Sequence, residues 1–370
     1  MNYGYFDVEN KEYVITRPDT PTPWLNYLGS GKFSGIISNN AGGLLFDSDP
    51  GNRRLTRYKY NSLPMDRPGY YLYIRDTKTG EYWSPTWQPV LKNLDFYECR
   101  HGLGYTTIKS AYNGIETEIT YYIPKDKNYT IWNGKIKNTS NEEKALKLFS
   151  YMEFSYHSAM VDITAEWARY VIASEFKNNT VIIDPSAQDC PTGPIYGFMS
   201  TDLDVSGHDT SRETFIGAYR SEQNPVAVEN GECFNTTISA DQLCAALECP
   251  VTLSAGEEKE FIFTVGTAVA KEDISSLVEQ ALDKMAAKQD LDDIKKEWNV
   301  YLSNCQIKTP DEDVNKMINI WHAYQCKMTF DWSRFISYYE RGVERGWGFR
   351  DSMQDVLGLC TQYLRKQRKR

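Results

Sequence analysis

The sequence predicts a large antiparallel β-sandwich, followed by a helical linker and the first helices of a second domain. Two observations lead to this prediction. Residues 1–270 contain many short apolar or aromatic runs bounded by turn-forming residues, with no helical pattern between them. From residue 275 onward, apolar residues recur at helical spacing instead. The 370 residues suffice for two or three domains, which we expect at 1–270, 271–305 and 306–370.

The strands of the first domain are expected from alternating patterns that polar turns separate. The clearest pair is YTIWNGKIKNTS and KALKLFSYMEFSY, joined by loop-forming residues at 138–144. A second pair lies at 249–268, where a Gly-containing turn separates two apolar runs. This series is too long for a single immunoglobulin-type unit. The other runs that we expect to be strands are EYVITRP, YYLYIRD, GIETEITYYIP, YVIASEF, NTVIIDP, PIYGFMSTD and FIGAYRS.

Helices are expected in the last hundred residues. Residues 271–305 carry two helical patterns and are interpreted as a linker. The run Thr309-Pro310-Asp311-Glu312 has the proline and acids of a helix start. After it, one apolar stripe predicts a long helix with a buried face, formed by Val314, Met317, Ile318, Trp321 and Tyr324.

Composition excludes several classes of partner. The net charge of −9 argues against nucleic acid, whose phosphates require a basic surface. No apolar run is long enough to span a membrane, and the N-terminus does not resemble a signal peptide. Eight scattered cysteines without a CxxC pair indicate free thiols, so we expect a cytoplasmic protein. The 14% of aromatic residues is a weak indication of carbohydrate binding.

The chemically richest stretch is Ser333–Asp355, SRFISYYERGVERGWGFRDSMQD. Four arginines and four carboxylates stand among aromatic residues, and three glycines interrupt any helix through its middle. Arginine binds phosphate with two parallel hydrogen bonds, and carboxylates accept hydrogen bonds from sugar hydroxyls. The stretch therefore suits a polyol that carries or meets an anion. A structural network of salt bridges in a tight loop is the alternative.

Three other stretches are weaker candidates. Asn26–Gly43 contains GSGKFSG but lacks the P-loop pattern, so we expect a flexible glycine-rich loop on the β-domain. In YWSPTWQP, Trp83 and Trp87 are expected to pack in the core, with a sugar platform as the alternative. Cys99 and His101 could share one face of a strand, but catalysis there is the minority interpretation. No metal-binding pattern is visible.

Ordered motifs along nearly the whole chain resemble one family, the inverting disaccharide phosphorylases of glycoside hydrolase family 94, of the cellobiose and cellodextrin phosphorylase type. The segments that carry the resemblance are YGYFDVENKEYVIT, PTPWLNYLGS, ISNNAGG, RLTRYKYN, YECRHGLGYT and GWGFRDSMQDVLG. The resemblance implies a β-sandwich, a linker helix and an (α/α)6 barrel, of which only the first helices are present.

The resemblance also implies an activity. The family transfers a β-linked glucosyl unit of cellobiose or a cellodextrin to inorganic phosphate with inversion, giving α-glucose 1-phosphate. Phosphate is a co-substrate, no metal or organic cofactor is needed, and a homodimer is implied. By the motif, Arg334 matches the phosphate-binding arginine, and Arg345 and Asp351 match the residues that hold the donor sugar. Arg350 and Asp355 belong to the same signature, with Arg350 a candidate for substrate binding.

Two departures from the family pattern modify these expectations. The family's general acid lies beyond residue 370, so no catalytic acid is assigned and we expect this polypeptide alone to be inactive. At the basic end, YLRKQRKR, our hypothesis is that the apolar helix at Val356–Leu359 has lost its continuation, as after a frameshift. A solvated basic C-terminus and a short nucleic-acid or membrane tail are the alternatives. In VDITAEWARY, Trp167-Ala168 stands near the place of a Gln-Arg pair of cellobiose-specific members, which favours a longer β-glucan acceptor or another β-glucoside. A non-catalytic carbohydrate-binding fragment and an unfolded remnant remain alternatives.

Overall fold

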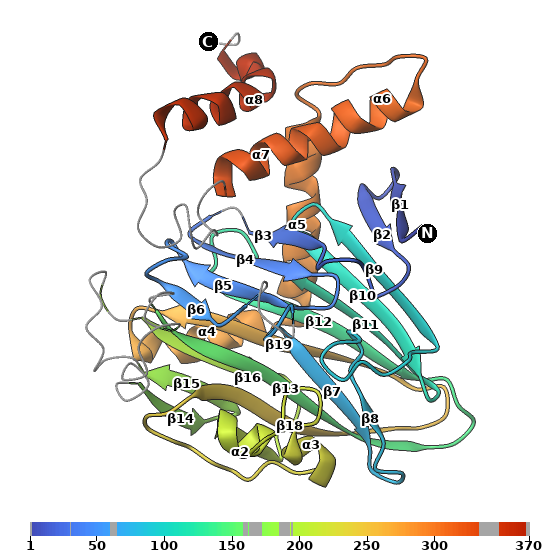
Figure 1. The fold of residues 1–370 in the computed structure, drawn as a ribbon, viewed down its shortest axis with the longest axis vertical. Coiled ribbons are helices and arrows are strands. Elements are labelled where there is room, and N and C mark those ends of the chain that lie inside the picture. The colour runs from blue at the N-terminus through green and yellow to red at the C-terminus, as the bar shows by residue number, and fades with distance from the viewer. Residues whose placement is uncertain are drawn as a thin grey trace.

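Two antiparallel sheets, packed face to face, form most of the molecule (Figure 1). The structure is a computed structural model and describes residues 2–29, 31–59, 65–157, 162, 172–184, 193, 195–332 and 348–367. Helices follow the last strand and rise from one end of the sandwich (Figure 1). The predicted fold class, an antiparallel sandwich followed by helices, is confirmed.

The first sheet contains ten strands among the described residues, in the order β1-β2-β9-β10-β11-β12-β19-β16-β15-β14. Its neighbours are antiparallel, and the long hairpin of β10 and β11 pairs Tyr105 with Tyr122 at one end and Tyr112 with Ile115 at the other. The bounds are β1 Gly4–Asp7, β2 Glu12–Ile15, β9 Phe96–Gly102, β10 Tyr105–Tyr112, β11 Ile115–Tyr122, β12 Tyr129–Asn138, β14 Ala173–Lys177, β15 Thr180–Asp184, β16 Tyr196–Thr201 and β19 Glu258–Ala268.

The second sheet is built around β13, a strand of fourteen residues. The order is β17-β18-β13-β6-β5-β4-β3, and β7 pairs with both β13 and β8. The bounds are β3 Leu25–Leu28, β4 Phe33–Ser38, β5 Gly43–Asp47, β6 Arg54–Thr56, β7 Tyr71–Asp76, β8 Tyr82–Trp83, β13 Lys144–His157, β17 Gly207–Ser211 and β18 Leu243–Leu253.

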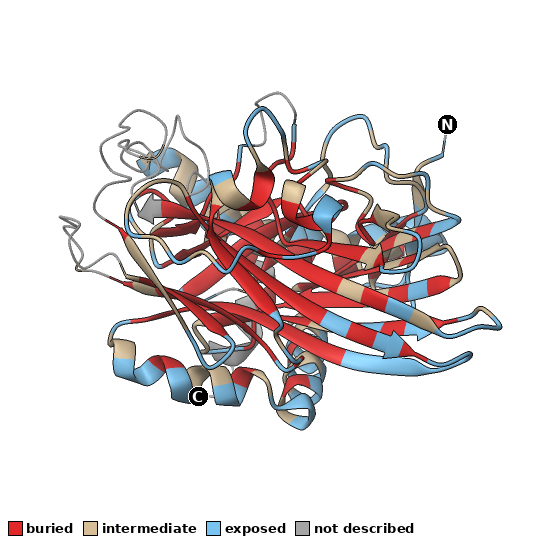
Figure 2. Ribbon diagram, turned by 90° about the horizontal axis from the view of Figure 1, so that it is seen from below, coloured by how far each residue is buried: buried red, intermediate tan, exposed pale blue. Residues whose placement is uncertain are grey.

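Alternation along β13 shows how sequence sets the layers. Leu148 and Met152 face the other sheet and join the main core. Phe149 and Tyr151 face the opposite way and pack under two short helices, α2 (Arg212–Ile216) and α3 (Val226–Asn230). The central strands are thus covered on both faces, and buried residues dominate the sheets (Figure 2).

Two sequence predictions fail in the β-domain. The run FIGAYRS is not a strand, because Ser211 caps a helix and accepts a hydrogen bond from the Thr214 N–H; α2 follows. The stretch Asn26–Gly43 is not a flexible loop, because it contains β3, β4 and the start of β5. All residues of β4 and β5 are buried, so the alternating pattern that marks a half-exposed strand is missing there.

The helical part begins directly after β19. A short 3₁₀ turn at Lys271–Asp273 precedes α4 (Ile274–Ala281) and α5 (Lys284–Leu302). Asp283 starts α5, because its carboxylate accepts hydrogen bonds from the N–H groups of Met285 and Ala286. Then come α6 (Glu312–Lys316), a π-helical turn labelled η3 (Met317–His322), α7 (Ala323–Trp332) and α8 (Phe349–Gln367).

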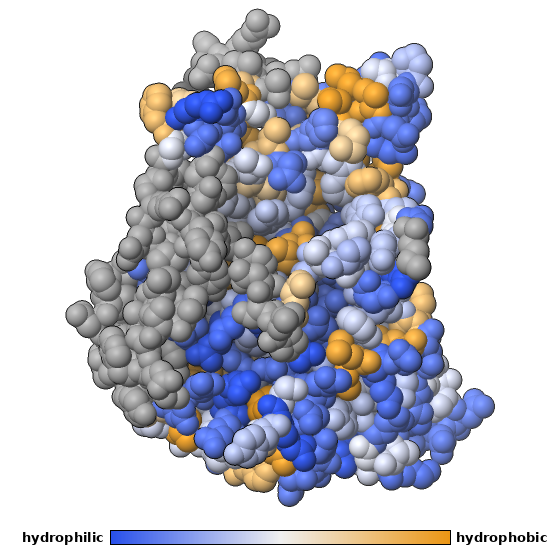
Figure 3. Space-filling model, in the orientation of Figure 1, coloured by the Kyte–Doolittle hydropathy of each residue, from blue (hydrophilic) through white to orange (hydrophobic). Residues whose placement is uncertain are grey.

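The π-helical turn explains why the predicted apolar stripe is wrong in part. A π turn adds a residue and rotates the helix face that follows it. The buried residues are Ile320, Ala323, Tyr324, Met328 and Trp332, whereas Val314 and Met317 are exposed. Hydrophobic surface is accordingly visible over the helical part of the molecule (Figure 3). None of the helices in the described ranges is both long and apolar enough to cross a membrane.

Candidate functional site

Helix α7 leads into the stretch Ser333–Asp355, and α8 begins within this stretch at Phe349. Arg334 and Arg345, the predicted phosphate and donor-sugar ligands, lie outside the described residues. The described part of the stretch runs from residue 348 to residue 355 and contains Arg350 and Asp351. The arrangement of the predicted arginines around Asp351 therefore stays a prediction.

Asp351 lies in the first turn of α8, where its negative charge is favourable to the helix dipole. The Ser352 N–H donates to the carbonyl of Gly348 at 2.9 Å, which closes this turn. A Cβ atom on Gly348 would lie 2.5 Å from Oδ2 of Asp351. Because such a contact is too short, the carboxylate can fold back over residue 348 only while that residue is glycine.

The faces of α8 separate the signature residues. Asp351 and Asp355 are half-buried and stand four residues apart, on the same face. Leu359 and Gln362 continue this face and are buried. Arg350 is exposed, so its guanidinium is accessible to a solute. Phe349, Met353 and Leu357 are exposed on other parts of the helix.

The second sheet supports α7. The Trp332 ring, at the last residue of α7, lies 5.1 Å from the Tyr27 ring and 5.4 Å from the Phe46 ring, measured between centroids. These rings belong to a cluster that strands β3–β5 share with α5, the π turn and α7. Helix α8 then packs on α7, because Gly358 has no side chain and lets Cys326 approach.

A buried polar joint connects α7 to both sheets, and sequence reasoning missed it. The Tyr324 hydroxyl donates to Oδ1 of Asn26 at 2.7 Å. The Asn26 Nδ2 group donates to the carbonyls of Gly102 and Tyr105, each at 2.8 Å, and to the Thr106 hydroxyl at 3.1 Å. All polar atoms of the Asn26 side chain are thus satisfied, and they fix the helix against β3 and the β9–β10 turn.

The histidine of the same turn is structural. The His101 Nε2 atom lies 2.9 Å from the Trp24 carbonyl, and Nδ1 lies 2.9 Å from the Thr106 hydroxyl. Burial lowers the pKa of His101 to about 4, so the ring is neutral. Its Nδ1 atom is 3.9 Å from the Cys99 sulfur, so the two side chains share a strand face as predicted. Burial, however, raises the pKa of the Cys99 thiol. Neither group is poised for nucleophilic catalysis.

The tryptophans of YWSPTWQP pack inside the protein, as expected. Trp83 is buried in the main core and its ring contacts the Tyr112 ring, with centroids 5.2 Å apart. Trp87 is partly buried against the same core. Neither ring is presented as a flat platform to solvent.

A chain of buried charges crosses the outer face of the second sheet. The Glu153 carboxylate is held by Arg57 at 3.2 Å, by Arg212 at 2.8 Å and by the Tyr151 hydroxyl at 2.7 Å. Burial alone would raise the pKa of Glu153, but the two arginines and the hydroxyl hold it below its usual value. Arg212 continues the chain to Glu222 at 2.9 Å.

This chain ends at Asp162, inside the segment predicted to shape the acceptor side. The Arg57 guanidinium donates from Nη2 to Oδ1 at 2.6 Å and from Nε to Oδ2 at 3.0 Å. Such a two-point contact fixes orientation as well as distance. Trp167 and Ala168, the residues that carried the acceptor prediction, lie outside the described residues. Among the residues that the structure does describe, no group of three His, Cys, Asp or Glu side chains could hold a metal ion.

Comparison with known proteins gives the family. The supersandwich domain of glycosyl hydrolase 94 matches residues 11–284, and the catalytic domain of the glycosyl hydrolase 94 superfamily matches residues 297–370. The chain belongs to glycoside hydrolase family 94. The family resemblance of the motifs is thereby confirmed, and α6, α7 and α8 all lie in the part that matches the catalytic domain.

Several relatives of this chain are phosphorylases by name. Two proteins named N,N'-diacetylchitobiose phosphorylase, from Vibrio furnissii and Vibrio proteolyticus, are each 38% identical over 97% and 100% of this chain. A solabiose phosphorylase from Paenibacillus borealis is 28% identical over 97% of the chain. This chain spans 45%, 46% and 46% of the lengths of these three proteins.

Solved structures agree with the fold of family 94. A bacterial glucoamylase in complex with acarbose superposes with a TM-score of 0.53 at 10% identity. The match covers 90% of this chain and 42% of the glucoamylase. At this identity the likeness concerns the fold alone, a sandwich followed by helices.

Proposed function

We propose that the protein cleaves a β-linked disaccharide by phosphorolysis. Inorganic phosphate attacks the anomeric carbon of the non-reducing sugar, and the bond from that carbon to the glycosidic oxygen breaks. A carboxylic acid of the catalytic domain, outside the residues of this chain, delivers a proton to the departing oxygen. The products are an α-sugar 1-phosphate and the released sugar. The observation that carries the proposal is the two-part family match along the whole chain.

The residues of this chain bind the reactants. Arg334 holds the attacking phosphate, for which a guanidinium supplies two parallel donors. Arg345 and Asp351 hold the hydroxyls of the donor sugar, and Arg350 of the same motif is a further candidate for substrate binding. The position of Asp351 at the start of α8 supports this role, because the half-buried carboxylate lies close to Gly348. No step requires a metal or an organic cofactor.

We propose N,N'-diacetylchitobiose as the substrate, with N-acetylglucosamine 1-phosphate as a product. Two relatives at 38% identity bear that substrate in their names. The sequence motifs alone predicted cellobiose or a cellodextrin as the glucosyl donor. None of the matched relatives is named a cellobiose or cellodextrin phosphorylase, so their names do not support this substrate. Glucosyl disaccharides remain the alternative, since a relative at 30% identity is named 3-O-β-D-glucopyranosyl-β-D-glucuronide phosphorylase.

The test is a phosphorolysis assay on purified protein that contains this chain together with the rest of the catalytic domain. We expect release of N-acetylglucosamine 1-phosphate from N,N'-diacetylchitobiose, dependent on phosphate, and little product from cellobiose. Arg334→Ala should raise the KM for phosphate, and Asp351→Asn should lower kcat/KM for the disaccharide roughly 100-fold, the typical effect of losing a buried charge contact. Glu142→Gln, on an exposed turn, is the control and should change neither value.

Two outcomes would contradict the proposal in different ways. A preference for cellobiose or cellodextrins would overturn the substrate and leave phosphorolysis intact. Release of free sugars at the same rate without phosphate would overturn phosphorolysis itself.

A further inference from the structure

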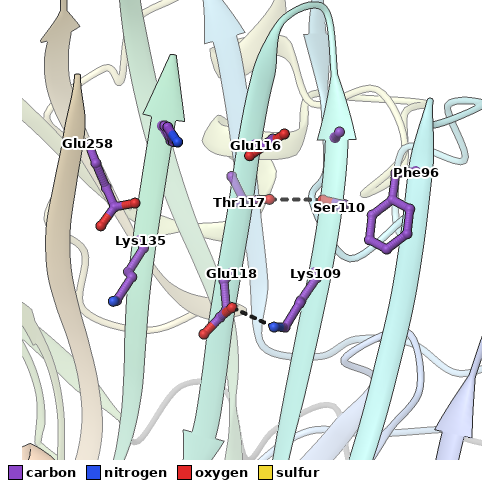
Figure 4. Close-up of a pocket in the computed structure, with 10 residues that line it drawn as sticks. Phe96, Lys109, Ser110, Glu116, Thr117, Glu118, Lys135 and Glu258 are labelled. Carbon is purple, nitrogen blue, oxygen red and sulfur yellow. Dashed lines mark hydrogen bonds and ion pairs between the residues drawn. The ribbon is translucent and has the colours of Figure 1, made fainter. Parts of the chain in front are cut away.

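We propose a second carbohydrate site on the outer face of the first sheet, a shallow hollow over β9–β12 and β19 that takes a neutral glycan chain. The hollow has a volume of about 530 Å³. Figure 4 shows its lining side chains standing on neighbouring strands, with the Phe96 ring at one side and Glu258 at the other. The site lies in the sandwich domain, outside Ser333–Asp355, and it stands or falls independently of the phosphorolysis proposed above.

The strand register arranges these side chains in two parallel rows. Row one runs across the strands as Lys109, Glu118, Lys135 and Glu260. Row two, two residues further along each strand, runs as Phe96, Ala111, Glu116, Lys137 and Glu258. Side chains two residues apart project from the same face of a sheet, so both rows face outward.

Row one is neutralised internally. The Lys109 ammonium lies 2.8 Å from the Glu118 carboxylate, and the Lys135 ammonium lies 3.5 Å from the Glu260 carboxylate. Cross-strand pairs of opposite charge are the ordinary way to stabilise an exposed sheet face. Row one alone would therefore be explained as a solvated surface.

Row two has the same alternation of charge, because Lys137 lies directly across from Glu116 and Glu258. Its side chains are nevertheless not drawn together: across the described ranges, those of Glu116, Lys137 and Glu258 form no ion pair and no hydrogen bond. Two acceptors thus flank one donor, all exposed at the hollow. Sugar hydroxyls both donate and accept hydrogen bonds, so such an alternation suits a polyol better than a simple ion.

The other end of row two supplies an apolar contact. The Phe96 side chain is 50% exposed, and its cross-strand neighbour Ala111 is small enough to leave a depression beside the ring. The C–H face of a pyranose ring can lie against the negative face of an aromatic ring. A sugar seated over Ala111 would have Phe96 on one side and Glu116 on the other.

Length and charge define the ligand further. Row two crosses four strand spacings of about 4.8 Å, or about 19 Å in all, so an extended oligosaccharide fits better than one sugar. The row carries two carboxylates and one ammonium, and the chain has a net charge of −9, so anionic glycans are disfavoured. The ligand class is therefore a neutral polysaccharide.

Affinity electrophoresis on the full chain tests the site. Native gels contain glycol chitin or hydroxyethyl cellulose as neutral polymers, or carboxymethyl cellulose as an anionic one. We expect the neutral polymers to slow the wild type. Phe96→Ala and Glu116→Gln should weaken this binding by about tenfold. Ala111→Leu, which fills the depression and leaves every charge in place, should abolish it.

A control variant and three contrary outcomes complete the test. Glu142→Gln removes an exposed carboxylate that does not line the hollow, and this variant should be slowed like the wild type. Circular dichroism checks that each variant is folded. An unretarded wild type would overturn the proposal, and so would Phe96→Ala and Ala111→Leu variants that are retarded as strongly as the wild type. Retardation by carboxymethyl cellulose alone would also overturn it.

Discussion

Protonation of one residue, Asp66, makes the stability of the sandwich depend on pH. Its carboxylate is buried and accepts hydrogen bonds from the Ser38 hydroxyl at 2.6 Å and the Tyr58 hydroxyl at 2.8 Å. Burial raises its pKa to about 6, against the opposing effect of these hydrogen bonds and of Arg67. Since the folded state binds this proton more tightly than the unfolded chain, the group contributes stability at low pH that is lost as the pH rises through 6.

Asp66→Asn should remove this dependence. Between pH 7 and pH 5 the wild type should gain about 1 kcal/mol of unfolding free energy relative to the variant. Urea denaturation at both pH values measures the difference. Asp95→Asn, an exposed carboxylate, is the control. Parallel pH profiles for the wild type and Asp66→Asn would contradict the assignment.

The hydrogen bond between Tyr324 and Asn26 is the second test at this scale. Tyr324→Phe leaves the buried Oδ1 atom of Asn26 without its donor, which should lower the unfolding free energy by about 1–3 kcal/mol. Tyr219→Phe, at a fully exposed tyrosine, should have no effect. A double-mutant cycle with Asn26→Ala measures the coupling, and additive effects would show that the contact does not contribute.

Among the elements, the strands that sequence predicted correctly are those with one regular pattern. β11 alternates between buried and less buried residues over Ile115–Ile119, and β12 does so over Asn133–Asn138, so a hydrophobic period is readable there. β4 and β5 are buried throughout, because Ile37 and Leu45 face the main core while Ile36 and Leu44 face the helices. The helices that cover the second face of β4 and β5 lie almost three hundred residues later in the chain. A local sequence pattern cannot show that they pack there.

The same limit applies to the candidate site. The signature residues Arg350 and Asp351 were identified from a contiguous motif, which sequence displays directly. Asn26 was missed because its partners Tyr324 and Gly102 are distant in the chain and its own neighbourhood resembles a loop. The π-helical turn also rotates the residues before it relative to those after it, so that Val314 and Met317 are exposed whereas Tyr324 is buried as predicted. No propensity rule marks such a turn.

Docking of α7 onto the second sheet gives a prediction at the level of elements. Trp332 is 5% exposed and contacts Tyr27 and Phe46, whereas Phe330, two residues earlier, is 41% exposed. Trp332→Ala should lower the unfolding free energy by about 3–5 kcal/mol, since it removes a large buried ring. Phe330→Ala should change it by less than about 1 kcal/mol. Equal effects of the two substitutions in urea denaturation would show that α7 is not docked as described.

For the whole molecule, the shared cluster of strands and helices implies cooperative unfolding. Ile36 and Phe46 of the sandwich pack in one cluster with Leu302, Met328 and Trp332 of the helical part. Neither part can therefore lose its structure without exposing apolar surface of the other.

We expect one thermal transition for both parts. Far-UV circular dichroism follows the strands and helices together. The nine tryptophans lie in both parts, so the fluorescence difference between the wild type and Trp321→Phe is used to follow the helical part. The two melting curves should coincide. If fluorescence changed well below the far-UV transition, the helices would be independent of the sandwich.

The Asn26 joint has a consequence for recombining members of family 94. The chain appears divisible after β19, where strands give way to helices. Yet α7, which belongs to the catalytic part, is fastened by Tyr324 to an asparagine of β3. A chimera that exchanges the sandwich alone would pack α7 on a sandwich surface that comes from another protein and fits that protein's own helix. Grafts between relatives should therefore carry α5 through Trp332 together with the sandwich.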